Sequence, residues 1–279
     1  MKTKTVFNNA KRTLLYVILV ISSIIMIFPF LWMLSTSFKT SAGVFSYPPQ
    51  FIPEPFHFAN YKKIWTLVPF ALGFLNSFKV TFSVVFLQLF TASLAAYAFS
   101  KLKFRGREKI FICIIATMMI PEQVTMIPLF LMFKQLNLLD SLAAIILPFA
   151  FNFPFGVFLL RQFVAKIPDE LTEAAHIDGA NVPIIYAVII LPMCKSAISA
   201  LAVFSFLGSW NNFLYPLLFL NTREKFTLQL MVSTLKGHFY TDWSLLMTGS
   251  AISILPVLIV YLICQKQIIE GIAITGLKG

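Results

Sequence analysis

Charge is scarce in this chain, and negative charge is the scarcer kind. Only 12% of the 279 residues are charged, with 11 acidic against 22 basic residues, whereas 58% are hydrophobic. Such a composition is too apolar for a water-soluble domain of this length. A spanning helix needs about 20 apolar residues, and several stretches qualify. We therefore expect a polytopic membrane protein, whose basic residues flank its spanning helices rather than bind nucleic acid.

Patterns for catalysis and metal binding are also missing. The sequence contains no G-x-x-x-x-G-K-[ST] loop for the phosphates of ATP and no H-E-x-x-H zinc motif. Its three cysteines and three histidines are dispersed, so their spacing suggests neither a disulfide framework nor a metal site. We therefore predict that the chain is not an enzyme, holds no metal or cofactor, and does not power itself with ATP.

Hydropathy predicts an all-α protein with six transmembrane helices. These lie at about 13–34, 71–98, 110–133, 142–161, 193–218 and 245–265. Proline and polar residues predict loops at 35–70, 134–141 and 219–244, and a polar interruption at 168–192. The chain then divides into an N-terminal arm (1–12), a first helix with its loop (13–70), a transmembrane core (71–265) and a tail (266–279).

The basic residues predict the orientation. The N-terminal arm, the loop 99–109, residues 161–192 and the tail hold about 13 Lys and Arg, whereas the loops on the other side hold about seven over a greater length. Basic residues are enriched in cytoplasmic loops. We therefore expect a multi-pass protein of the cell (plasma or inner) membrane, with both termini and the 168–192 stretch in the cytoplasm.

The 168–192 stretch is predicted to begin with a short helix. Pro168 precedes it, and Asp169 and Glu170 place negative charge beside the first free N–H groups. Gly179 is a suitable left-handed stop, and Asn181 can cap a second short turn. An ordinary surface helix between two buried ones explains this spacing equally well.

A few polar side chains fall within the apolar segments. Glu122 is the one acid well inside a predicted span, where charge is costly unless it faces a cavity or a partner. It could line a pore or carry a proton, or lie exposed at a helix end broken by Pro121 and Pro128. The amides that could line a passage, or instead bond neighbouring helices, are Gln88, Asn152, Asn211 and Asn212.

The 168–192 stretch resembles the EAA loop in the permease subunits of bacterial ATP-binding-cassette importers. The matching residues are Glu173-Ala174-Ala175, Asp178-Gly179-Ala180, and Ile189 with Leu191-Pro192, in the family's spacing without a gap. Segments similar to the carbohydrate branch, and to the smaller permease of maltose-type systems, are 28–40, 96–107, 119–130, 210–217 and 270–279. Glu122 departs from that pattern, because a small residue is common there.

The resemblance implies a type I importer permease with a MetI-like fold. It implies that the helix at about 169–178 docks on a cytoplasmic ATPase dimer, which binds the ATP, and that Glu173 makes polar contacts there. It also implies a second, different permease chain and an extracytoplasmic binding protein that delivers a sugar. Two alternatives remain: import of glycerol phosphate or another polar solute by the same architecture, and a self-contained proton-coupled transporter that uses Glu122.

Overall fold

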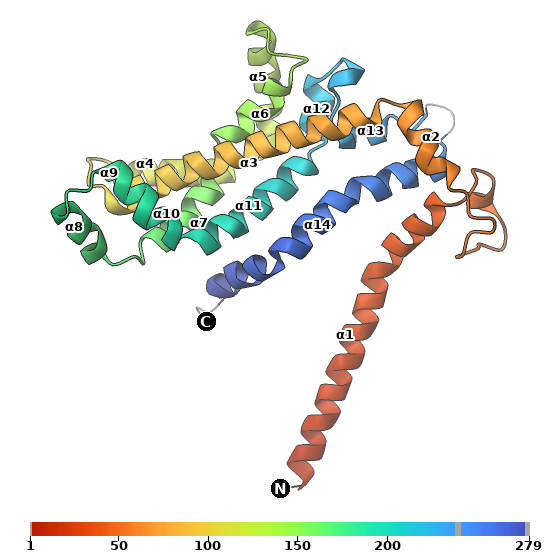
Figure 1. Cartoon of the computed structure of the whole chain (residues 1–279), viewed down its shortest axis with the longest axis horizontal. Coiled ribbons are helices and arrows are strands. Elements are labelled where there is room, and N and C mark those ends of the chain that lie inside the picture. The colour runs from red at the N-terminus through yellow and green to blue at the C-terminus, as the bar shows by residue number, and fades with distance from the viewer. Residues whose placement is uncertain (1, 238–240, 277–279) are drawn as a thin grey trace. The chain divides into compact units, whose positions relative to one another are not determined.

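The computed structural model describes residues 2–237 and 241–276, and most of these residues are helical. They contain no β-strand, only an isolated antiparallel bridge between Lys236 and Thr241. A π-helix, Ile185–Ile190, joins two short helices, Val182–Ile184 and Leu191–Met193. The helices labelled in Figure 1 and their neighbours are α1 (Lys2–Ser37), α2 (Ala59–Leu67), α3 (Phe70–Lys101), α4 (Arg107–Ala116), α5 (Glu122–Gln135), α6 (Leu142–Ala150), α7 (Pro154–Val164), α8 (Asp169–Ile177), α9 (Val182–Ile184), α10 (Leu191–Met193), α11 (Lys195–Trp210), α12 (Leu214–Phe219), α13 (Leu228–Ser233) and α14 (Trp243–Gly276).

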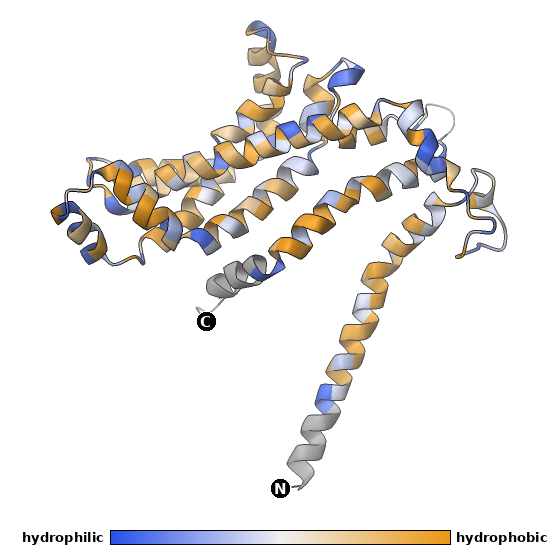
Figure 2. Ribbon diagram, viewed as in Figure 1, coloured by the Kyte–Doolittle hydropathy of each residue, from blue (hydrophilic) through white to orange (hydrophobic). Residues whose placement is uncertain are grey.

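Helix length and hydropathy give four to six membrane spans. Four are single helices or continuous runs: Lys11–Ser37, Phe70–Lys101, Leu142–Val164 and Trp243–Lys266. Two further spans arise if each bent pair counts as one: Arg107–Met119 with Glu122–Gln135, bent by 98°, and Val182–Met193 with Lys195–Trp210, bent by 79°. Figure 2 shows the hydrophobic residues gathered on these helices and hydrophilic residues on α8 and the connecting loops. The predicted all-α, multi-span architecture is confirmed.

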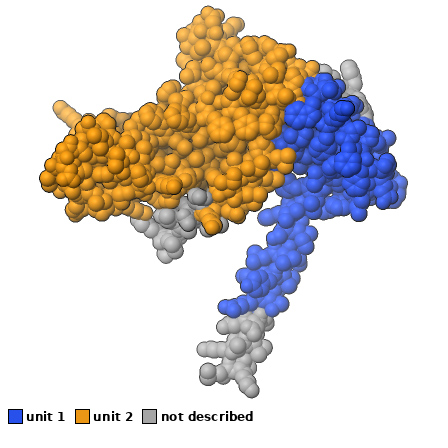
Figure 3. Space-filling model, in the orientation of Figure 1, with its two compact units in different colours: residues 1–68, 232–254 blue, residues 69–231, 255–279 orange. Residues whose placement is uncertain are grey.

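The chain forms two compact units, coloured separately in Figure 3. One comprises Met1–Val68 with Val232–Ile254, and the other Pro69–Met231 with Leu255–Gly279. In the first unit, the buried Asn60 amide donates to the carbonyls of Ser37 and Lys39, at 2.9 and 2.8 Å. Every predicted site residue belongs to the second unit.

The second unit is built around α3, which packs against α6, α7 and α11. A close approach is possible because the buried face of α3 carries many small residues. A Cβ added at Gly73, for example, would lie 3.2 Å from the Cβ of Met231. The small and hydroxyl-bearing residues buried on α3 are Gly73, Ser77, Thr81, Ala92, Ser93 and Ala96.

Two hydrophobic cores lie along α3. One joins its C-terminal half, through Ala96, to Leu160 of α7, Ile185 and Leu201 of α11. The other joins Val84 in the first half of α3 to residues of α6 and α12. The helix thus connects the region around residues 168–192 to the opposite end of the unit.

Several predicted loop and helix bounds are wrong. The 35–70 loop contains α2, and the 219–244 loop contains α13. The short turn predicted after Asn181 extends further than expected, since residues 182–193 are helical throughout. Pro183 lies in the first turn of this run, where proline is tolerated. The predicted helix 193–218 ends at Trp210, and α12 is separate from it.

Candidate functional site

The short helix predicted after Pro168 is α8, and both of its ends have the expected chemistry. Asp169 and Glu170 lie in its first turn. At its other end Gly179 has a φ of +83°, and the Ala180 N–H bonds the Ala175 carbonyl at 2.9 Å. A Cβ at Gly179 would meet nothing within 4 Å. The glycine is therefore required by backbone conformation, not by lack of space.

The two alanines of the EAA segment have different surroundings. Ala175 is half-buried and packs against the hydrophobic core of α3 and α7, as does Ala180. Ala174, Glu173 and Asp178 are exposed. The helix thus rests on its own chain through one small residue and leaves the others open to a second surface.

Lys101, the last residue of α3, fastens the N-terminal end of α8. Its ammonium donates hydrogen bonds of 2.5 Å to the Ile167 carbonyl and to the Asp169 carboxylate. The Lys101 side chain is 7% exposed and that of Asp169 75% exposed. The hydrogen bond from Lys101 and its positive charge lower the pKa of Asp169, so this carboxylate is ionised at neutral pH.

A second attachment to α3 follows the short turn that Asn181 caps through its side chain. The Tyr186 hydroxyl and the Ser93 hydroxyl on α3 share a buried hydrogen bond of 2.7 Å, and the rings of Tyr186 and Tyr97 lie 5.7 Å apart. Leu191 packs against the same core, and Pro192 lies in the first turn of α10. The whole 168–192 stretch is therefore anchored on one helix.

A neighbouring ion pair braces the same end of the unit. Arg161 of α7 donates to both carboxylate oxygens of Glu108 at 2.7 and 2.9 Å. Its guanidinium also lies 3.9 Å from the centre of the Phe111 ring.

The sequence analysis did not predict the roles of Lys101, Tyr186 and Arg161. Only the concentration of basic residues in the 99–109 loop pointed toward Lys101.

The predicted pathway residues meet at one cavity. Gln88, Glu122, Asn152, Asn211 and Asn212 all line a space of about 480 Å³. Four phenylalanines and Tyr215 complete much of its wall. Glu122, Asn152 and Tyr215 also line a neighbouring cavity of about 820 Å³. The fold of the second unit thus brings together the five residues that were predicted separately from the sequence.

These side chains differ in what they can still bind. Gln88 is buried, donates to the Phe149 carbonyl at 2.9 Å and accepts from the Ser205 hydroxyl. Asn212 accepts from the Tyr215 N–H at 3.2 Å. Asn152 and Asn211 are exposed. Gln88 therefore bonds neighbouring helices, as one of the two sequence interpretations expected, while Asn152 and Asn211 have free hydrogen-bonding groups facing the cavity.

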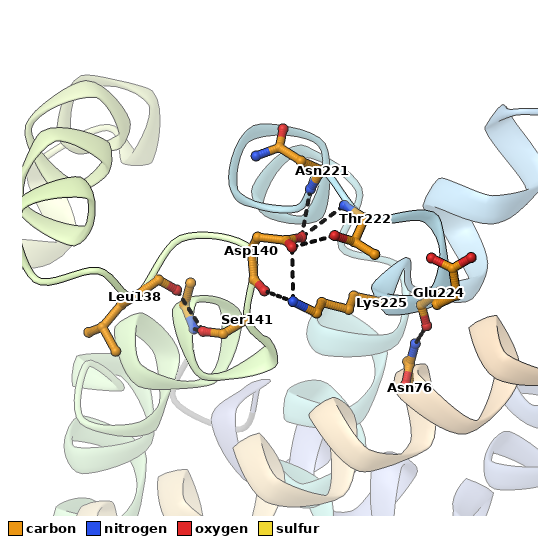
Figure 4. A network of polar contacts seen from close by, with 9 residues as sticks. Asn76, Leu138, Asp140, Ser141, Asn221, Thr222, Glu224 and Lys225 are labelled. Carbon is orange, nitrogen blue, oxygen red and sulfur yellow. Dashed lines mark hydrogen bonds and ion pairs between the residues drawn. The ribbon is translucent and has the colours of Figure 1, made fainter.

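The far end of the unit has its own polar network, drawn in Figure 4. The Asp140 carboxylate accepts from the backbone N–H groups of Asn221 and Thr222, both at 2.9 Å, and from the Lys225 ammonium at 2.9 Å. Asn76 of α3 donates to the carbonyl of Glu224 at 2.8 Å. Burial raises the pKa of Asp140, but these hydrogen bonds outweigh it and hold the pKa well below its usual range.

The described residues offer no metal centre: among them, no three His, Cys, Asp or Glu side chains come together to hold an ion. The second unit thus combines an internal cavity, lined by aromatic and amide side chains, with an exposed helix that is anchored to the unit. The chain belongs to the family of binding-protein-dependent transport system inner membrane components, whose sequence profile matches residues 88–273. It is therefore a multi-pass membrane permease component.

Relatives and a solved structure agree with this assignment. The chain is 37% identical to the arabinooligosaccharides transport system permease protein AraQ of Bacillus subtilis, over 74% of this chain and 73% of the relative. It is 32% identical to the diacetylchitobiose uptake system permease protein NgcG of Streptomyces coelicolor, over 92% and 86%. It also matches a chain in the crystal structure of a bacterial ABC transporter involved in the import of the acidic polysaccharide alginate, with a TM-score of 0.82 and 27% identity, over 91% of this chain and 95% of that one.

Proposed function

We propose that this chain is the permease subunit of an ATP-binding-cassette importer that carries a sugar across the cell membrane. A separate cytoplasmic ATPase dimer binds and hydrolyses the ATP, and the chain itself holds no cofactor. An extracytoplasmic binding protein delivers the sugar, and a second, different permease completes the pathway. The printed names of the similar permeases, which concern arabinooligosaccharides and diacetylchitobiose, support a carbohydrate substrate.

The observation that carries this proposal is the exposed α8 on its two anchors. Glu173, Ala174 and Asp178 are open to a partner, while Ala175 rests on the core. Small residues permit close approach of a second surface, and Gly179 provides the turn that ends the helix. In our proposal α8 docks in a groove of the ATPase, with Glu173 making polar contacts. Ala180, Leu191 and Pro192 hold the returning chain.

The anchors define a route for force from the ATPase. A push on α8 reaches α3 through Lys101 and through Ser93, which are 2.5 and 2.7 Å from their partners. The same helix carries Gln88 at the cavity and Asn76 at the polar network beyond it. A continuous helix moves as a rigid body, and packed elements switch between discrete arrangements. Rocking of α3 would therefore open the cavity to one side and then to the other.

The orientation follows from the distribution of basic residues. Both termini and the 168–192 stretch lie in the cytoplasm in our proposal, and the Asp140 network then lies outside. The 219–244 loop is our candidate contact for the binding protein, and its residues 238–240 lie outside the described residues. Asp140 and Lys225 would hold the start of this loop in a fixed position for docking.

The experiment that tests the function is reconstitution in proteoliposomes. The complete assembly, with the second permease, ATPase and binding protein, should take up labelled oligosaccharides from a panel only when ATP is present inside. Omission of the ATPase should abolish uptake. Transport by this chain alone, driven by a proton gradient, would contradict the proposal and favour a self-contained carrier based on Glu122.

A further inference from the structure

The cavity of the second unit contains one charged side chain. Glu122 lines both the 480 Å³ space and its 820 Å³ neighbour. No Lys, Arg or His is found among the described residues that line either cavity. Glu122 also takes part in none of the ion pairs between residues in the described ranges. Glu122 lies exposed in the first turn of α5, and no cationic side chain of the described residues pairs with it.

The nearest polar groups do not remove that charge. The Tyr215 phenol lines the same two cavities as Glu122. The Thr125 hydroxyl donates to the Glu122 backbone carbonyl at 2.8 Å instead of to the carboxylate. Tyr215 and Thr125 are neutral, so the field of the carboxylate extends into the cavity. Because an ionised carboxylate can only accept hydrogen bonds, its preferred ligands are hydroxyl and ammonium groups.

The rest of the wall suits a carbohydrate. Phe149, Phe153, Phe204 and Phe213 offer apolar faces, and Asn152 and Asn211 offer amide donors and acceptors. Aromatic faces next to a few convergent polar groups are typical of binding pockets for small polar molecules. An acidic sugar would bring a second negative charge to this wall, where repulsion is stronger than in bulk water because the surroundings are less polarisable.

We propose that Glu122 makes this cavity select against acidic saccharides, and that the permease carries a saccharide without an acidic group. This inference rests on the proposed import function and narrows its substrate class to neutral or amino-bearing sugars. It also disfavours glycerol phosphate, which carries a phosphate anion. The fold does not decide the charge, since the similar solved transporter is involved in the import of an acidic polysaccharide. In our proposal, the residue at position 122 determines whether an acidic saccharide is accepted.

The test measures the electrostatic field directly, without relying on the binding protein. A cysteine is introduced as Asn211→Cys, and separately as Asn152→Cys, after Cys113, Cys194 and Cys264 are replaced by serine or alanine. Rates of modification by a cationic and an anionic methanethiosulfonate reagent are then compared in the assembled transporter. One carboxylate in the wall of the same cavity should favour the cationic reagent by about tenfold.

Two further variants make the result specific to Glu122. Glu122→Gln should bring the cation-to-anion ratio to within about twofold of that for the reagents with a free thiol. The matched control Glu54→Gln removes the same charge from an exposed loop of the other unit and should leave the ratio unchanged. A ratio that Glu122→Gln does not change at either cysteine would overturn the inference and would mean that a partner chain neutralises the carboxylate.

Uptake by the same preparations separates the two proposals. If no saccharide is transported by the assembly that contains the unmodified chain, the proposed function fails. If neutral oligosaccharides are transported but Glu122→Gln leaves the cation-to-anion ratio unchanged, only the proposed selection against acidic saccharides fails. Efficient uptake of a polyuronate fragment by the unmodified assembly would also overturn it.

Discussion

The ammonium of Lys101 and the carboxylate of Asp169 lie 2.5 Å apart, although 68 residues separate them in the chain. The same ammonium holds the Ile167 carbonyl at 2.5 Å. Because Lys101 ends α3 and Asp169 begins α8, this contact joins the exposed helix to the central helix of the unit. It gives the proposed coupling a physical link that can be cut.

Cutting that link should separate ATP hydrolysis from transport. Lys101→Met leaves the aliphatic packing but removes both hydrogen bonds, so α8 can move without moving α3. We expect the reconstituted assembly to keep hydrolysing ATP while sugar uptake falls severalfold. Lys109→Met is the matched control, since Lys109 is an exposed cation that takes part in no ion pair between described residues. Equal losses of hydrolysis and uptake in Lys101→Met would contradict the proposed role.

Substitutions of Gly179, which follows α8, should reduce uptake to different extents. Its φ of +83° costs an alanine about 1–2 kcal/mol, whereas asparagine tolerates this region. Uptake should therefore fall in Gly179→Ala, because the end of α8 is strained, and should fall less in Gly179→Asn, although asparagine is larger. The reverse order, with Asn worse than Ala, would indicate that a partner fills the space beside Gly179 and that size decides.

The buried pair of Tyr186 and Ser93 predicts a non-additive result. Ser93→Ala removes the partner of the buried Tyr186 hydroxyl and should destabilise the protein by about 1–3 kcal/mol. Tyr186→Phe should cost less, because the Ser93 hydroxyl keeps its bond to the Phe90 carbonyl at 3.1 Å, and the double variant should cost less than the sum. Thermal unfolding of the purified chain in detergent measures this. Strictly additive losses would show that the two hydroxyls do not act as a pair.

The Asp140 carboxylate should make the stability that the network in Figure 4 provides depend on pH. Its pKa is lower in the folded protein than in the unfolded chain, where it is about 3.9. Its stabilising contribution is therefore fully present above about pH 4 and is lost as pH falls through the lower, folded value. The difference in Tm between the unmodified protein and Asp140→Asn should be constant from pH 7 to about pH 5 and shrink below pH 4. A difference that disappears already between pH 7 and pH 5 would contradict this assignment.

The sequence predicts the parts of this structure that depend on local chemistry. Long apolar runs define α3 to within a few residues, and Gly179 and Asn181 show the bounds of short elements because only certain residues suit those positions. The turn after Asn181 was predicted, but its continuation as helix up to Met193 was not, because Leu191-Pro192 was interpreted as the end of the stretch. The link between Lys101 and Asp169, and the meeting of Glu122 with Asn211, depend on tertiary packing, which a single sequence does not reveal.

The central claim is that α8 is the point at which a cytoplasmic ATPase acts on this chain. Cysteine cross-linking tests it most directly, in a background without Cys113, Cys194 and Cys264. Ala174→Cys, which is exposed, should form a cross-link to a cysteine in the ATPase groove, and Ala175→Cys, which packs on its own core, should do so far less efficiently. The account is contradicted if Ala174→Cys captures no ATPase, or if a membrane-impermeant thiol reagent reaches it from outside intact cells.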